Sequence, residues 1–216
     1  MRFTQQITLC STLVLLAACV SSPATPYENT VSDEISAPCI DNRDALLAMS
    51  FEDFDQDLDG GWRVIADRDA CQIAAADLLA DYRIQYESDE NFHSLSTLIW
   101  HEGQVRAGAG QTDQALALFR RSYKEITHDT DLAWNYYVDA TIAFLEQDRE
   151  ALDAAHAGLK AVPEPDFWAA TAEKFEAEYG QKIVWPSNLN VVETLQACFG
   201  RSYAEAYGDC DEASDE

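Results

Sequence analysis

Three aspartates at alternate positions are the sharpest candidate for metal chemistry in this chain of 216 residues. Asp55, Asp57 and Asp59 precede Gly60, which permits the sharp turn that would bring the three carboxylates together. Carboxylate oxygens are ligands that calcium prefers, so calcium is the cofactor that this turn could bind. The other interpretation is an acidic turn between two helices, closed by glycine and anchored by Trp62.

The order D-x-D-x-D-G that starts at Asp55 resembles the first half of an EF-hand calcium loop. That resemblance implies a bidentate glutamate at position 66, where this chain has Ala66. Asp67 comes one residue late, and Arg63 adds a positive charge beside the turn. We therefore expect weak calcium binding at most, and no other cofactor.

The sequence contains no nucleophile elbow, phosphate-binding loop or dinucleotide-binding motif that would indicate an enzyme. His93 and His101 lack the spacing of a zinc site, so we expect ordinary surface or groove histidines. A pair of carboxylates that cleaves a glycan would leave no recognisable pattern among 39 acidic residues. An exported enzyme or ligand-binding protein that acts on a small or glycan substrate therefore stays an alternative function.

Residues 1–18 have the features of a secretion signal, because Arg2 is followed by an apolar stretch too short to span a membrane comfortably. The stretch ends in Leu-Ala-Ala-Cys at Cys19, which resembles the lipobox of bacterial lipoproteins. The resemblance implies that Cys19 is the lipidated first residue of the mature chain. Val20 after it implies the outer membrane, with the domain in the periplasm. The alternative is an ordinary signal peptide cleaved nearby.

An even number of cysteines follows this segment, which predicts disulfides in an exported chain. The four are Cys39, Cys71, Cys198 and Cys210. Three pairings are possible, and we favour Cys39–Cys71 with Cys198–Cys210, because each pair is near in sequence and would fasten a terminal piece of the domain. None of the spacings is C-x-x-C, which disfavours a zinc knuckle or a thioredoxin-type redox pair.

From residue 41 onward the apolar residues recur at helical spacing without strand-like alternation, so the chain is predicted to be all-α. Glycines and prolines mark several helix ends. Helices are expected over residues 42–53, 66–87, 91–108, 112–125, 131–146, 148–161, 166–179 and 189–207, the last broken near Gly200. The predicted domain covers residues 39–210, between a flexible tether at 19–38 and an acidic disordered tail at 211–216.

Two of these helix pairs align with each other when the sequence is shifted by 36 residues, which sets Ala115 on Ala151 and Trp100 on Tyr136. Small residues let antiparallel helices approach closely, and an aromatic residue fills the groove that they leave. Over residues 96–165 the pattern resembles the tetratricopeptide repeat (TPR). The resemblance implies a short stack of antiparallel helix pairs with an irregular helical cap at the C-terminal end. A non-repetitive helical bundle is the alternative.

The TPR resemblance places aromatic and polar side chains on a concave face, where such arrays bind peptides. The candidates are Trp100, Gln104, Tyr136, Tyr137 and Asp139. Rigid aromatic rings beside amides and acids suit a peptide groove, although the same rings also suit a core between helices.

The net charge of −25 limits the partners. A chain this acidic repels nucleic-acid phosphates and anionic lipid headgroups, which excludes simple nucleic-acid binding and leaves covalent lipid as the expected contact with the membrane. We therefore expect a lipid-anchored envelope protein whose TPR-like helical domain binds another protein or peptide, and we expect that partner to be basic.

Overall fold

The computed structural model describes residues 39–89, 92–208 and 210. This part of the chain is helical and contains no β-strand, which confirms the all-α prediction. Cys19, the tether and the acidic tail lie outside the described residues. The elements are α2 (Arg43–Leu47), the π-helical turn η1 (Glu52–Gln56), α3 (Arg63–Ala66), α4 (Gln72–Ile84), α5 (Leu95–Gly108), α6 (Thr112–Arg121), α7 (Asp129–Leu145), α8 (Arg149–Lys160), α9 (Trp168–Tyr179), α10 (Leu189–Ala197) and α11 (Tyr203–Tyr207).

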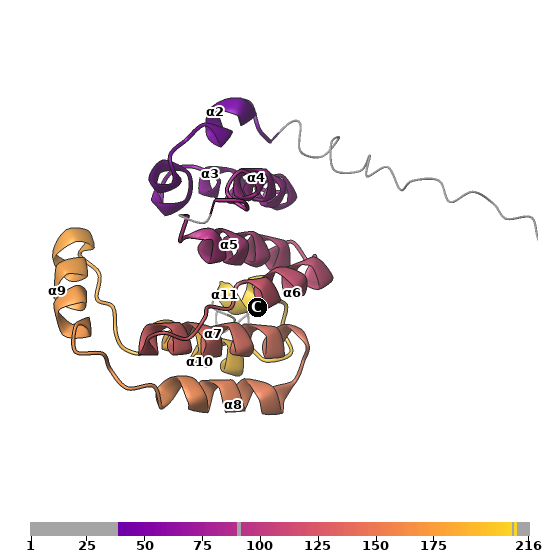
Figure 1. Ribbon diagram of the computed structural model, residues 1–216. Coiled ribbons are helices and arrows are strands. Elements are labelled where there is room, and N and C mark those ends of the chain that lie inside the picture. Colours follow the sequence, from indigo (N-terminus) through magenta and orange to yellow (C-terminus); the bar gives the residue numbers. More distant parts are fainter. Residues whose placement is uncertain (1–38, 90–91, 209, 211–216) are drawn as a thin grey trace, which may run out of the picture.

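Helices α4 to α8 form a stack in chain order (Figure 1). Helix α5 packs against α4 and α6, while α7 packs against α6 and α8. The turns inside the two pairs are short because one residue in each takes a left-handed conformation. Gly110 has φ +78° between α5 and α6, and Gln147 has φ +58° between α7 and α8.

Each of these two pairs contains a close approach in which an aromatic ring fills the space beside a glycine. A Cβ atom at Gly103 of α5 would lie 2.7 Å from the ring of Phe119 on α6. In the second pair the small and the large residue exchange helices, because Gly158 of α8 lies against the ring of Tyr136 on α7. In both pairs a glycine of one helix therefore packs against an aromatic ring of the other, but the glycine lies on the first helix of α5–α6 and on the second helix of α7–α8.

The buried apolar side chains form two clusters. The smaller cluster lies among η1, α3 and α4 and includes Phe54 and Tyr82, whose rings stack at 3.7 Å. The larger cluster joins α5 to α8 with α10 and α11. Helix α5 connects them, because Leu98 belongs to the smaller cluster and Trp100 to the larger one.

The N-terminal helices are shorter than predicted. Residues 42–53 were expected to form one helix, but α2 ends at Leu47 and η1 follows as a separate turn. The helix expected from residue 66 starts at Gln72, because Ala70 takes a left-handed φ of 61° just before it. Disulfides join Cys39 to Cys71 and Cys198 to Cys210, the pairing that the sequence spacing favours.

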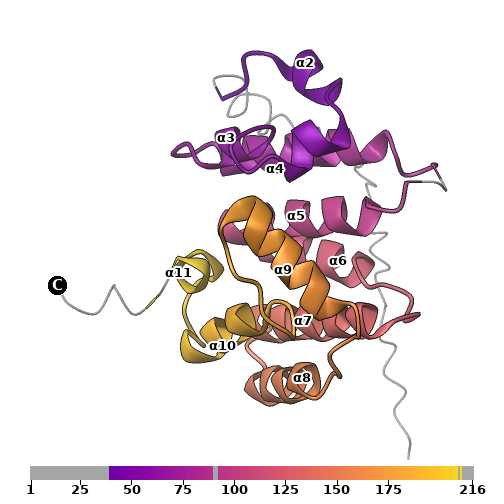
Figure 2. The same ribbon diagram turned by 90° about the vertical axis from the view of Figure 1, so that its left-hand side faces the viewer.

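The C-terminal helices are arranged irregularly around the stack. Helix α9 stands apart from the stack, and in Figure 2 it crosses in front of α5, α6 and α7. None of its described side chains is buried. Helix α10 packs against α7 and α8, and α11 packs against α5 and α10. The predicted break near Gly200 is confirmed, since Gly200 has φ +92° between α10 and α11.

Candidate functional site

Two of the five predicted groove residues lie in the core. The side chains of Trp100 and Tyr137 are each 3% exposed, and their ring centroids are 4.6 Å apart. Trp100 also lies 4.5 Å from the ring of Phe119 and 5.2 Å from that of Trp134. The prediction that Trp100 and Tyr137 contact a partner is therefore corrected for this structure, because packing between neighbouring helices buries both rings.

Helix α11 lies over part of the same face of α5 and α7, so Gln104 also has a partner within the chain. Gln104 Nε2 donates a hydrogen bond to the hydroxyl oxygen of Tyr207 at 3.0 Å, and the Tyr207 hydroxyl also hydrogen-bonds to that of Tyr137. Burial raises the pKa of Tyr137 well above its ordinary value, and the nearby Tyr207 raises it further. The two phenols therefore stay neutral in this contact at physiological pH.

An open hollow of about 350 Å³ lies between α7 and α8, and we call it the α7–α8 hollow. It is lined by Tyr136, Asp139, Ile142, Ala143, Glu146, Ala151, Ala154 and Ala155. The other two predicted groove residues, Tyr136 and Asp139, thus meet at one site. Tyr136 and Tyr137 separate because successive residues of an α-helix point about 100° apart, so neighbours in the sequence face different surfaces.

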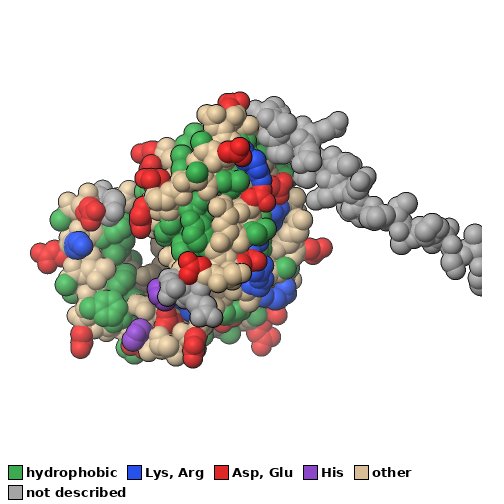
Figure 3. Space-filling view, turned by 45° about the horizontal axis from the view of Figure 1, so that its top comes forward, with side chains coloured by type: hydrophobic (Ala, Val, Ile, Leu, Met, Phe, Trp, Pro, Cys, Tyr) green, Lys and Arg blue, Asp and Glu red, His purple; other side chains and the backbone are tan. Residues whose placement is uncertain are grey.

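Two exposed carboxylates stand at the α7–α8 hollow. Asp139 accepts a hydrogen bond from the Tyr123 hydroxyl, and Glu146 pairs with Arg120. Burial and the bond to Asp139 raise the pKa of Tyr123, so this phenol remains a donor. Figure 3 shows acidic side chains spread over the visible face of the molecule, whereas most basic ones gather in one strip. The α7–α8 hollow therefore combines an apolar floor of alanines with two carboxylates, of which Glu146 is already paired with Arg120.

The predicted calcium ligands do not converge. Asp55 is fully buried, whereas Asp57 and Asp59 are exposed, and Asp57 Oδ1 accepts the backbone N–H of Asp59 at 3.0 Å. Within residues 39–89, 92–208 and 210, no group of three His, Cys, Asp or Glu side chains could hold a metal ion. The structure replaces the calcium interpretation with that of an acidic turn. Its anchor is the indole of Trp62, which donates a hydrogen bond to Asp55.

Sequence reasoning missed the contact between Asp55 and His101. Asp55 Oδ1 lies 2.7 Å from His101 Nδ1 and 3.0 Å from Trp62 Nε1. Burial raises the pKa of Asp55, but hydrogen bonds and charges from His101, Trp62 and Arg63 lower it by more, so this pKa lies below its usual value. Asp55 and His101 are 46 residues apart, so no local pattern connects them. The contact fastens the acidic turn to α5.

A buried ionic network between α4 and α5 was also missed. Glu102, whose side chain is 4% exposed, accepts from Arg83 Nε at 2.8 Å and from Arg106 Nε at 2.9 Å. Arg106 also donates to Asp77 at 3.1 Å and to Gln111 at 2.8 Å. The signal available in the sequence is the spacing of four between Glu102 and Arg106 on one helix. Since these groups bind one another, the network positions α5 on α4.

Comparison with protein-family models, curated proteins and solved structures finds no match for this chain. The interpretation of its surfaces therefore depends on their geometry. Within the described part of the chain, no helix combines the length and the apolar character needed to cross a membrane.

Proposed function

We propose that this chain is a lipid-anchored protein of the bacterial cell envelope whose helical domain binds a basic segment of another envelope protein. The observation that carries the proposal is the α7–α8 hollow, because it combines an apolar floor with the carboxylates of Asp139 and Glu146. Tyr136 and Asp139 in this hollow are also residues that the TPR resemblance assigns to a groove.

The stacking of helix pairs supports a TPR-like array. The pairs α5–α6 and α7–α8 have short turns, and each contains a glycine packed against an aromatic ring. Helix α10 contacts both α7 and α8, as the first helix of a third pair would. Arrays of stacked helix pairs offer extended surfaces on which a segment of another protein can lie.

The size and charge of the α7–α8 hollow suit one or two side chains of a partner. An apolar side chain would contact Ile142 and Ala154, and a neighbouring lysine or arginine would approach Asp139 and Glu146. Ion pairs with exposed carboxylates contribute about 0–1 kcal/mol each. Apolar contact therefore supplies most of the affinity, while the negative charge selects basic partners and speeds their association.

The anchor in this proposal is a lipid on Cys19, in the outer membrane, with the domain in the periplasm. Loss of residues 1–18 removes one arginine and no acid, which makes the net charge −26. Such a domain is repelled by anionic headgroups, so covalent lipid holds it at the membrane. A segment of 20 residues reaches about 70 Å at most, so the domain can reach partners away from the bilayer surface.

Paired arginine substitutions test the binding surface. Ala154→Arg places a long cationic side chain in the α7–α8 hollow. Ala117→Arg places the same side chain at an exposed position of α6 outside the hollow. Partners are captured by chemical cross-linking from cells that produce each tagged chain and are quantified by mass spectrometry. We expect a protein with a basic segment to be recovered with the parent and with Ala117→Arg, but much less with Ala154→Arg. Equal recovery with the two variants would contradict the assignment of the hollow.

Metabolic labelling with an alkyne fatty acid tests the anchor. The parent chain should incorporate the label and sediment with membranes, and Cys19→Ala should do neither. Cys10→Ala is the matched control, because Cys10 lies within the predicted signal segment and should not affect labelling. A labelled Cys19→Ala chain would show that the lipid is attached elsewhere or that residue 19 is incidental.

A further inference from the structure

A second open hollow of about 350 Å³ lies where the segment before α7 meets the segment after α8. We call it the Ile126 hollow, and it is lined by Ile126, Thr127, His128, Asp129, Pro165 and Phe167. Ile126 is 59% exposed, and Phe167 is 54% exposed. Single exposed apolar side chains are common, but two large ones at one hollow form a patch of the kind that marks a binding surface.

Helix α7 lines both hollows with one of its faces. Asp129 lines the Ile126 hollow, whereas Tyr136 and Ala143 line the α7–α8 hollow. Each of these residues is seven positions from the next, which is almost two full turns, so they lie in one row along α7. With a rise of 1.5 Å per residue, Tyr136 lies about 10 Å and Ala143 about 20 Å from Asp129 along the helix. The two hollows therefore share one floor.

The segment that follows α6 leads from one hollow to the other. Tyr123, just after the end of α6, binds Asp139 of α7. The backbone N–H and carbonyl groups of Lys124 bind the side-chain amide of Asn135, each at 2.9 Å. This segment therefore runs toward the start of α7, where it reaches Ile126.

Helix α8 leads to the same place from the other side of α7. Its residue Ala151 lines the α7–α8 hollow, and its later residue Gly158 packs on Tyr136. The chain after α8 then reaches Phe167 at the Ile126 hollow. Figures 1 and 2 show α7 between α6 and α8. The two hollows are thus parts of one groove, which we call the α7 groove, with α7 as its floor and α6 and α8 as its walls.

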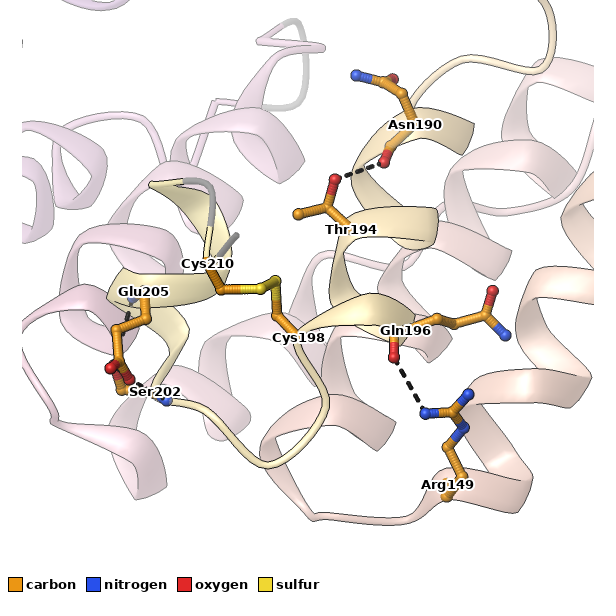
Figure 4. The surroundings of a disulfide bond; sticks show 8 residues. All are labelled: Arg149, Asn190, Thr194, Gln196, Cys198, Ser202, Glu205 and Cys210. Carbon is orange, nitrogen blue, oxygen red and sulfur yellow. Dashed lines mark hydrogen bonds between the residues drawn. A yellow bond between two sulfur atoms is a disulfide. The ribbon is translucent and has the colours of Figure 1, made fainter. Parts of the chain in front are cut away.

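The walls of the α7 groove are held by further contacts. Arg120 of α6 pairs with Glu146 of α7. At the start of α8, Arg149 donates a hydrogen bond to the backbone oxygen of Gln196 on α10 at 3.0 Å (Figure 4). A surface that is already in place loses less conformational entropy when a partner binds. The cost of ordering therefore falls mainly on the partner.

The charge at each hollow is negative, because Asp129 and Asp139 are exposed. Lys124 lies nearby, but its Nζ is 4.4 Å from the ring centroid of Trp134. Trp134 is two positions before Tyr136, so it lies about 200° away from it around α7. The α7 groove therefore offers apolar contacts and a carboxylate at each hollow, which complements a segment that carries both apolar and basic residues.

We propose that one extended segment occupies the whole α7 groove, with one apolar side chain in each hollow and lysine or arginine residues beside Asp129 and Asp139. The segment belongs to the partner of the proposed function, on which this inference rests. Each hollow has room for a side chain but not for a helix of about 10–12 Å diameter, so the segment is extended. An extended chain advances about 3.3 Å per residue, so apolar residues about 10–20 Å apart are three to six positions apart.

A peptide library supplies the probe for this proposal. Random 12-residue peptides displayed on phage are selected against the purified full chain. We expect the enriched peptides to carry lysine or arginine together with two apolar residues three to six positions apart. Enrichment of no peptide, or of peptides without this spacing, would overturn the proposal.

Serine substitutions then test the Ile126 hollow with a selected peptide. Ile126→Ser and Phe167→Ser should each weaken binding at least about fivefold in fluorescence anisotropy, because each removes apolar contact from this hollow. Ile84→Ser is the matched control, since Ile84 is 57% exposed and lies on α4 outside both hollows. The control should bind the peptide as the parent does, and all three variants should keep the circular dichroism of the parent.

A double-mutant cycle assigns each apolar residue of the peptide to one hollow. Each of the two is replaced by serine in turn. One replacement should weaken binding to the parent but have little further effect on Phe167→Ser, because its hollow is already altered. The other replacement should keep its full effect on Phe167→Ser. If both replacements keep their full effect on Phe167→Ser, no peptide residue occupies the Ile126 hollow and the proposal is wrong.

The outcomes separate failure of this proposal from failure of the proposed function. If Ala154→Arg weakens peptide binding but Ile126→Ser and Phe167→Ser do not, the segment occupies the α7–α8 hollow alone. That result would overturn the proposal and leave the proposed function in place. If Ala154→Arg has no effect, the α7–α8 hollow is not a binding surface, and both are wrong.

Discussion

Replacement of Glu102 by glutamine should destabilise the domain more than any change to an exposed ion pair. The two side chains have nearly the same shape, so Glu102→Gln creates no cavity. Glu102 accepts hydrogen bonds from Arg83 Nε at 2.8 Å and from Arg106 Nε at 2.9 Å. Glutamine has only one side-chain oxygen that can accept, and its NH2 group would turn a donor toward the other guanidinium group. Loss of one partner from a buried ionic network costs about 3–5 kcal/mol.

The lower end of that range applies here, because Arg106 keeps Asp77 and Gln111, and Arg83 keeps Glu87. We expect a loss of about 3 kcal/mol in the free energy of unfolding. For a domain of this size that loss corresponds to a decrease of roughly 10 °C in the melting temperature. Thermal and urea unfolding followed by circular dichroism at 222 nm measure both quantities.

Glu87→Gln is the matched control for this substitution. Glu87 also binds Arg83, and it binds Arg121 at 2.9 Å, but its side chain is 38% exposed. We therefore expect a loss of less than about 1 kcal/mol. The reasoning would be refuted if Glu102→Gln and Glu87→Gln had the same effect, because burial of the Glu102 network would then contribute nothing to stability.

Three further perturbations have defined outcomes. Gly103→Val should destabilise the domain by about 1–3 kcal/mol, because its Cβ would overlap the Phe119 ring. In the control Gly108→Ala the new Cβ meets no atom within 4 Å, so this variant should keep the stability of the parent. Equal melting temperatures of the two variants would contradict this packing. Asp55→Asn should reduce the acid sensitivity of unfolding. Because the pKa of Asp55 is lower in the folded than in the unfolded protein, its carboxylate stabilises the folded state fully above the unfolded pKa of 3.8. This contribution is lost as the pH falls through the lower folded pKa. Free energies of unfolding measured between pH 2 and 6 should therefore fall less steeply with decreasing pH in Asp55→Asn than in the parent. Millimolar calcium should not change the melting temperature of the domain, since Asp55, Asp57 and Asp59 do not converge; a clear increase that Asp57→Asn abolishes would restore the calcium interpretation.

Much of the fold was predictable because its signals are local. Helical periodicity and the glycines and prolines that mark helix ends placed α5 to α8 and the last helices within a few residues of their observed bounds. The repeat alignment placed Tyr136 and Asp139 on one face, and both line the α7–α8 hollow, but that a partner binds there stays a prediction. The N-terminal region was less predictable, because Ala70 takes a left-handed conformation before α4 although no glycine or proline marks a helix boundary there.

By itself, the sequence determined the helical class, the order of most helices, the favoured cysteine pairs and the excess of negative charge. Each follows from residue type or from spacing along one helix or one chain segment. Only the tertiary structure decided that Trp100 and Tyr137 are buried, that Asp55 meets His101, and that α11 covers part of the face once expected to be open. These contacts join residues far apart in sequence, so they depend on how whole helices stack, which no local pattern encodes.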